Sequence, residues 1–246
     1  MSPARKPLRI AAVQCVSHPG DIARTIAEHA AQIEAAAEDG ATVVVFPELS
    51  LTGYEPDLID LHGIRIAVDD PVLQPLSRIC QQRRVHALVG VPTAGTALPQ
   101  IGVLHIDDRG AVRPAYAKQH LHVGEIGIFG AGPSGALLDI GGWKLALSIC
   151  SDAAVPAHPA AARRAGADAY LVAGLYLIGA EQRLAQQMEQ ASRQGLWVLL
   201  AQYSGGTGGG PACGRSGGWR PDGSEAVRLG AGPGIAVMDL VDPDAN

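Results

Sequence analysis

Three side chains of types that can carry out covalent chemistry stand where apolar runs of the chain end. Cys150 closes "WKLALSIC", Glu48 follows "TVVVFP", and Lys118 comes directly after "RPAYA". An apolar run that stops at a polar residue is typical of a buried strand that delivers this residue to a pocket built from loops. A cysteine in such a place can attack a carbonyl carbon once its thiol has lost its proton.

Glu48 and Lys118 suit the two other needs of this chemistry. Desolvation at the tip of a buried strand would raise the pKa of a carboxyl group, which suits Glu48 to proton transfer. Only three of the 19 basic residues are lysine, so Lys118 suggests a place that requires a compact ammonium rather than a guanidinium. Each residue alone also has an ordinary interpretation: Cys150 as a packing residue, Glu48 as a cap of the next turn, and Lys118 as a lysine without a special role.

A metal site is the rival interpretation of the same region. It would use His120 and His122, with Cys150 or Asp152 as further ligands. Alternate residues of a loop can both bind zinc, but no third ligand stands at a recognisable spacing. We therefore predict no metal and no cofactor, solvated loop histidines, and an Asp152 that braces the turn after the cysteine.

Composition argues against several classes of partner. The formal net charge is −5, and no basic cluster is longer than a pair, which argues against nucleic acid and anionic membranes as partners. No apolar segment approaches membrane-spanning length, and the basic start is not followed by a signal-peptide core. We expect a soluble, cytoplasmic protein. The four cysteines have no Cys-x-x-Cys pair and are expected to be reduced thiols.

Helical and strand periodicities alternate along the chain, with hairpin signals between them. No linker and no solenoid repeat is visible, so we predict one domain over residues 1–246. Hairpins within an alternating pattern favour two mixed sheets packed face to face, with helices outside. Residues 49–63 are expected to form a long loop, and the glycine-rich residues 204–218 a mobile one. The expected strands are 8–15, 42–46, 85–91, 100–106, 111–117, 136–140, 143–149, 169–175, 196–203 and 234–240, and the expected helices are 21–40, one beginning at 70–71, 157–166 and 181–195.

Three segments together resemble a known family. "VVVFPELSLTGYEPD", "YAKQHLHVGEIGIFGAG" and "LALSICSDAAVP" resemble, in this order, the signature segments of the nitrilase superfamily of carbon–nitrogen hydrolases, and weaker matches extend over nearly the whole chain. The resemblance implies a four-layer αββα sandwich and a homodimer or larger homo-oligomer. It also implies a catalytic set of Glu48, Lys118 and Cys150, with Glu125 as a second glutamate.

The resemblance implies amidase-like hydrolysis of a non-peptide carbon–nitrogen bond. Cys150 would form a thioester with a small-molecule amide, while Lys118 and a backbone N–H near Ser151 stabilise the oxyanion. Tyr54 and Tyr176 are expected to line the pocket or its rim. N-carbamoyl or nitrile hydrolysis at the same site, transfer of the acyl group to an amine, and a catalytically weak paralogue that binds a metabolite stay open.

The chain departs from the family pattern in two places. After Cys150, where relatives often have arginine and glutamate, it has Ala154 and Ala157. Losing the arginine removes an anchor for an acidic substrate and favours an uncharged or weakly polar acyl group. In the third long helix Arg193 replaces an acidic residue at a position expected to face the interior, which predicts altered packing or a different pocket wall.

Overall fold

Strands make up the core of the molecule, and helices cover it. The computed structural model describes residues 5–95, 97–133, 135 and 137–242. The ends of the predicted domain at 1–4 and 243–246, and the predicted strand start at residue 136, lie outside these. The strands are Leu8–Val16 (β1), Val43–Val45 (β2), His86–Thr93 (β3), Gln100–Ile106 (β4), Val112–Ala117 (β5), Leu138–Ile140 (β6), Trp143–Ile149 (β7), Ala169–Gly174 (β8), Trp197–Thr207 (β9), Gly210–Cys213 (β10), Gly217–Trp219 (β11), Glu225–Arg228 (β12) and Gly234–Leu240 (β13). The α-helices are Ile22–Glu38 (α1), Pro56–His62 (α2), Gln74–Arg83 (α3), Ala157–Arg164 (α4) and Glu181–Ser192 (α5), and the 3₁₀ turns are Pro71–Leu73 (η1), Val123–Glu125 (η2) and Cys150–Ala154 (η3).

The order of the strands explains how distant segments meet. Hydrogen bonds connect the described strands in the order β5-β4-β3-β2-β1-β9-β8-β7-β6, with β13 paired to β1. β1, β2 and β3 are parallel, as are β7, β8 and β9, and β1 is parallel to β9. β4 is antiparallel to both β3 and β5, so β5 runs in the direction of β2. The carboxyl ends of β2, β5 and β7 therefore point toward the same end of the molecule.

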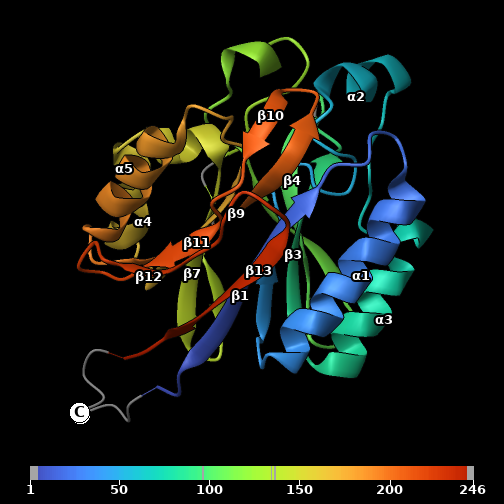
Figure 1. Cartoon of the computed structure of the whole chain (residues 1–246). Helices are drawn as coiled ribbons and strands as arrows, with labels where there is room; N and C mark the ends of the chain where they lie inside the picture. Colours follow the sequence, from blue (N-terminus) through green and yellow to red (C-terminus); the bar gives the residue numbers. More distant parts are fainter. Residues whose placement is uncertain (1–4, 96, 134, 136, 243–246) are drawn as a thin grey trace.

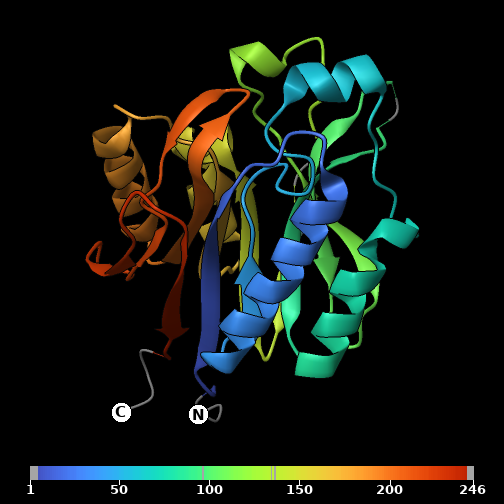
Figure 2. The ribbon, with the colours of Figure 1, turned by 45° about the vertical axis from the view of Figure 1, so that its right-hand side comes forward.

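Helices lie on both outer sides of the strands. α1 and α3 cover one side, and α4 and α5 lie on the opposite side, with β1 and β13 between them (Figure 1). The turned view keeps α1 beside α3 and α5 far from both (Figure 2). The protein thus has an α/β fold with mixed strand directions. Because the pairings form one connected network, the four-layer sandwich of two separate sheets stays a prediction. None of the described helices has the length and apolarity needed to span a bilayer.

Two predicted loops are instead regular structure. The expected loop 49–63 contains α2, with Pro56 in its first turn and Gly63 as a left-handed C-cap at φ 59°, both ordinary helix boundary signals. Much of the glycine-rich segment forms the hairpin of β9 and β10 rather than a loop. A Cβ at Gly208 would overlap the Tyr54 carbonyl and the Glu55 side chain, so glycine permits this hairpin to pack against the segment before α2.

The expected interior position of Arg193 is wrong. Arg193 caps the C-terminus of α5, is solvent-exposed and pairs with Glu189 one turn earlier at 2.8 Å. A charge at this exposed position does not change the pocket wall.

The stability of the folded protein is expected to depend on pH through His29. His29 of α1 is buried and stacks on Phe46 at 4.0 Å between ring centroids, and burial lowers its pKa to about 3. The unfolded chain takes up a proton on this histidine below about pH 6.5 and the folded chain does not, so stability falls as the pH falls. Between pH 8 and pH 5 the parent protein should lose about 2 kcal/mol that His29→Leu does not lose. Urea unfolding of both proteins at the two pH values measures this, and equal pH dependence would refute it.

Candidate active site

The three residues at strand ends meet at one end of the molecule. Glu48 stands three residues past β2, and Lys118 and Cys150 directly follow β5 and β7. Because these strands run in the same direction, their carboxyl ends deliver the three side chains to one region. Glu48 and Lys118 are fully buried, and Cys150 is half-buried.

Lys118 lies between two buried carboxylates. Its Nζ donates to Oε1 of Glu48 and to Oε1 of Glu125, each at 2.6 Å. The Tyr54 hydroxyl donates to the same Glu125 oxygen at 2.8 Å, and the backbone N–H of His122 donates to the other at 2.7 Å. Three donors, from Lys118, Tyr54 and His122, therefore hold Glu125 in place next to the ammonium.

Burial sets the protonation of the site. It raises the pKa of the Glu48 carboxyl to about 7, assisted by repulsion from Glu125 and opposed by the attraction of Lys118. Burial also raises the pKa of the Cys150 thiol to about 12, and the charge of Glu48 adds to this rise while Lys118 opposes it. Burial lowers the pKa of Lys118, but the charges of Glu48, Cys150 and Glu125 outweigh this, so its pKa lies above the ordinary value. Lys118 stays protonated, and the resting cysteine is a neutral thiol.

The backbone at Cys150 adopts a conformation that non-glycine residues rarely take. Cys150 has φ 45° and opens η3, and its Sγ lies 3.5 Å from the carbonyl oxygen of Leu175, to which it donates. A left-handed backbone at such a residue costs about 1–3 kcal/mol and persists only where its surroundings impose it. The Oε2 atom of Glu48 has no hydrogen-bond partner among the described residues.

A cavity of about 400 Å³ opens onto these groups. Glu48 and Cys150 line it, as do all three residues predicted to contact substrate: Tyr54, Ser151 and Tyr176. Tyr54 and Tyr176 are both buried rather than rim residues, and burial raises the pKa of both hydroxyls.

Sequence reasoning missed much of the cavity wall. The Tyr176 hydroxyl donates to Oε1 of Gln187 at 2.7 Å, and Gln187 and Arg183 of α5 both line the cavity. Their spacing of four residues places them on one face of the helix. This spacing could have indicated both residues, because the sequence already related this helix to the pocket wall. The further lining residues are Glu55, Pro56, Asp57, His122, Gly124, Ala154, Leu175, Leu177, Gly208 and Gly209.

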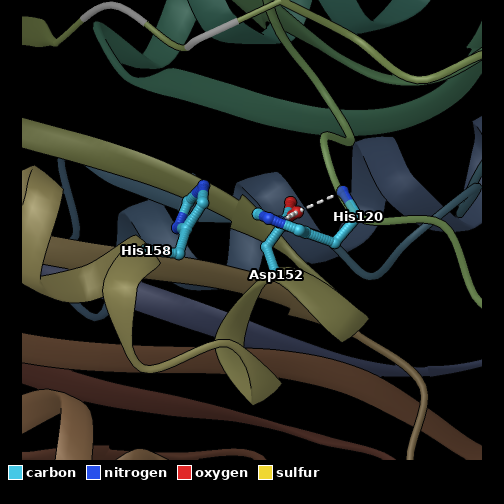
Figure 3. A group of neighbouring side chains, drawn as sticks. All are labelled: His120, Asp152 and His158. Carbon is cyan, nitrogen blue, oxygen red and sulfur yellow. Dashed lines mark hydrogen bonds and ion pairs between the residues drawn. The ribbon is translucent and has the colours of Figure 1, made fainter.

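The two histidines of the rival metal interpretation are not brought together. His122 borders the cavity, and its ring accepts from the backbone N–H of Gly124. His120 instead lies near Asp152 and His158, and one possible ligand atom from each of the three lies within 4.8 Å of the others (Figure 3). The sequence pattern does not single out His158. Within the described part of the chain this is the set whose geometry could admit a metal ion.

Comparisons with known proteins identify the family of the chain. The family model for carbon–nitrogen hydrolases matches residues 9–244. A Pseudomonas protegens protein described as a hydrolase in the pqqF 5′ region is 30% identical over 241 residues, which cover 96% of this chain and 83% of that protein.

Solved structures of one enzyme resemble the chain along its length. The amidase from Nesterenkonia sp. AN1, as a double mutant in complex with acrylamide, superposes with a TM-score of 0.88 at 26% identity, covering 100% of this chain and 95% of the other. A single mutant of it in complex with butyramide gives a TM-score of 0.86 at 27% identity, covering 95% and 91%. Another of its structures is described as an amidase of the nitrilase superfamily. The chain belongs to the carbon–nitrogen hydrolase family, and within it to the amidase-like enzymes of the nitrilase superfamily.

Proposed function

We propose that the protein hydrolyses small linear amides through a thioester on Cys150. The observation that carries this proposal is the buried ammonium of Lys118, held at 2.6 Å by both Glu48 and Glu125, beside a cavity that Glu48 and Cys150 line. A nucleophile, a base with a pKa near 7 and a fixed positive charge are the three groups that acyl transfer needs.

The proposed reaction begins with the neutral thiol. Glu48 takes the thiol proton on Oε2, the oxygen without another partner, as Sγ forms a bond to the amide carbon. The negative charge that develops on the carbonyl oxygen is stabilised by Lys118 and a backbone N–H near Ser151, and one such donor lowers the barrier by about 3 kcal/mol. Glu48 then returns the proton to the nitrogen, the C–N bond breaks, and ammonia or an amine leaves.

Water completes the cycle. Glu48 takes a proton from a water molecule, whose oxygen attacks the thioester carbon. The C–S bond breaks, the sulfur recovers a proton, and the carboxylic acid leaves. Glu125 holds the ammonium of Lys118 in place throughout. No cofactor takes part in these steps.

A relative supports the assignment of a cysteine nucleophile. In one structure of the Nesterenkonia amidase the acetamide moiety of fluoroacetamide is covalently attached at the active-site cysteine. Tyr54, Leu175, Tyr176 and Leu177 form an apolar part of the cavity lining, which suits a short, uncharged or weakly polar acyl group. We also propose that the chain works in the cytoplasm as a homodimer or larger homo-oligomer with the two-sheet sandwich of its family.

A panel of small compounds tests the function. The protein is incubated with acetamide, butyramide, an N-carbamoyl amino acid and an aliphatic nitrile, while released ammonia is measured and the intact mass is followed for an acyl adduct on Cys150. Ammonia from the amides together with an adduct that turns over supports the proposal. Ammonia mainly from the carbamoyl compound or the nitrile would reassign the substrate. Binding with neither ammonia nor adduct would identify a metabolite-binding paralogue.

The pH profile of the reaction is expected to report Glu48. The base must be ionised to accept the thiol proton, and burial together with Glu125 raises its pKa to about 7 against the opposing Lys118. Below about pH 7, kcat/KM for acetamide should therefore fall close to tenfold per pH unit, and above it the profile should level off. An acid limb near pH 4.5, in a protein shown to be folded across the range, would contradict this assignment.

A further inference from the structure

One buried carboxylate outside the cavity lining gathers donors from two segments of the site. The fully buried Asp152 accepts five hydrogen bonds. Its Oδ2 accepts from the Ile149 N–H at 3.0 Å and from the Tyr116 hydroxyl at 2.7 Å. Its Oδ1 accepts from the N–H groups of Gln119 and His120 at 3.2 and 2.8 Å. The Nδ1 of His120 lies 2.9 Å from the same oxygen.

These donors flank two of the three residues to which the reaction is assigned. Ile149 immediately precedes Cys150, and Gln119 immediately follows Lys118. One carboxylate thus ties the backbone before the sulfur to the backbone after the ammonium. A change at Asp152 would therefore alter the distance between the Cys150 and Lys118 segments without touching the substrate cavity.

A chain of hydrogen bonds through Tyr116, His158 and Tyr170 holds the Asp152 carboxylate in place. The Tyr116 hydroxyl that donates to Asp152 also lies 2.9 Å from Nε2 of His158, whose Nδ1 lies 2.7 Å from the Tyr170 hydroxyl. Burial lowers the pKa of His158, so this ring is neutral and can donate with one nitrogen and accept with the other. Tyr170 belongs to β8 and His158 to α4, so the carboxylate is supported by elements other than those that lead into Cys150 and Lys118.

The same three side chains could instead bind a metal, but their hydrogen bonds favour a brace. Figure 3 shows His120 bonded to Asp152, with His158 set apart from this pair. His158 is connected to Asp152 indirectly, through the Tyr116 hydroxyl and through Gln119. A metal ion would have to displace backbone N–H groups from a buried carboxylate, and each buried donor left without a partner costs about 1–3 kcal/mol.

We propose that Asp152 is a positioning residue that holds the Cys150 segment and the Lys118 segment in register, with Tyr116 and His158 fixing its carboxylate. This inference rests on the proposed function. It assigns Asp152 no contact with substrate. Misplacing one reacting group by about 1 Å can cost about 100-fold in rate, so a small shift in this register should have a large effect on kcat.

Asp152→Asn is compared with a matched buried carboxylate elsewhere. Asp107→Asn is the control, because Asp107 is also buried and also accepts backbone N–H groups, from Arg109 and Ala111, in the turn at the opposite end of β5. At position 152 an asparagine NH₂ opposes a backbone donor whichever way the amide points, because both carboxylate oxygens accept backbone N–H groups. At position 107 it opposes either the backbone donors or the Arg113 guanidinium, so both variants should lose stability. Asp152→Asn should in addition lower kcat about 100-fold with KM changed less than about threefold, and Asp107→Asn should leave both within about threefold.

The acid limb of the pH profile supplies a readout that a general loss of stability would not move. If the Lys118 segment shifts away, Glu48 loses part of the attraction that lowers its pKa, and the acid limb should move to higher pH in Asp152→Asn but not in the control Asp107→Asn. Tyr116→Phe removes the hydroxyl that links Asp152 to His158 while keeping the ring. This variant should lower kcat and move the acid limb to higher pH, both by less than Asp152→Asn does.

The outcomes separate this inference from the function on which it rests. Equal kcat losses in Asp152→Asn and Asp107→Asn with an unmoved acid limb would overturn the positioning role while leaving the amidase proposal intact. If Asp152→Asn does not fold, Tyr116→Phe decides, and an unchanged kcat and limb in that variant overturn the inference. Turnover that survives Cys150→Ala would instead overturn the proposed function.

Discussion

Replacing Cys150 by alanine is expected to abolish amide turnover, lowering kcat/KM at least about 10⁴-fold, because no other group at the site can form the thioester. Glu48 and Lys118 would keep their ion pair and the cavity would keep its other walls, so small amides should still bind. Ammonia release under saturating amide, together with intact mass after incubation, measures both the lost turnover and the absence of an adduct.

Two other cysteines provide controls for this result. Cys80 is buried on the inner face of α3, and Cys213 is buried at the end of β10, where Nε2 of Gln202 lies 3.2 Å from its sulfur. Neither lines the cavity, so Cys80→Ala and Cys213→Ala should keep most of the turnover. If all three cysteine variants were equally active, or if the Cys150→Ala protein still formed an acyl adduct, the assignment of the nucleophile would be wrong.

Replacing Lys118 by arginine is expected to lower kcat about 10²–10³-fold even though the positive charge is retained. The Nζ atom donates to Glu48 and Glu125 at 2.6 Å from a fully buried position. A planar guanidinium is larger and directs its five N–H groups into a fixed fork, so it cannot occupy this space and present a single charge to the oxyanion. Steady-state kinetics with acetamide and thermal unfolding of the same preparation measure the two consequences.

Lys144→Arg is the matched control for this substitution. Lys144 lies on β7 and is solvent-exposed, so the same change of cation should leave kcat and the melting temperature unchanged there. Lys118→Arg should lower both. Full activity in Lys118→Arg would show that any cation suffices, and the oxyanion role of the ammonium would have to be given to another group.

Sequence reasoning singled out three residues that the structure brings to one region, but it missed much of what surrounds them. Glu48, Lys118 and Cys150 could be singled out because each follows an apolar run, and the directions of β2, β5 and β7 bring such strand ends together. The functional roles of these residues stay proposals. The hydrogen bond from Tyr54 to Glu125 could not be predicted, because it joins two loops whose approach depends on packing rather than on any local pattern.

The errors have identifiable physical causes. Glycine lowers the intrinsic preference for strand structure, so the sequence of residues 204–218 predicts a loop. Pairing between β9 and β10, which this local preference does not reveal, stabilises the hairpin instead. The helix α2 was missed although Pro56 and Gly63 mark its ends, because its few residues show little periodicity. Arg193 was placed inside by analogy with relatives, whereas the last turn of α5 points it to solvent.

The high pKa of the Cys150 thiol also affects how readily this enzyme would be inactivated by oxidation. Peroxide oxidises the thiolate form of cysteine, and a sulfenic acid is the first product. Burial together with the negative charge of Glu48 keeps the resting sulfur protonated, at a pKa of about 12. A protein whose sulfur becomes reactive only while a carbonyl group is in front of it should therefore withstand oxidants that inactivate enzymes with a permanently ionised cysteine.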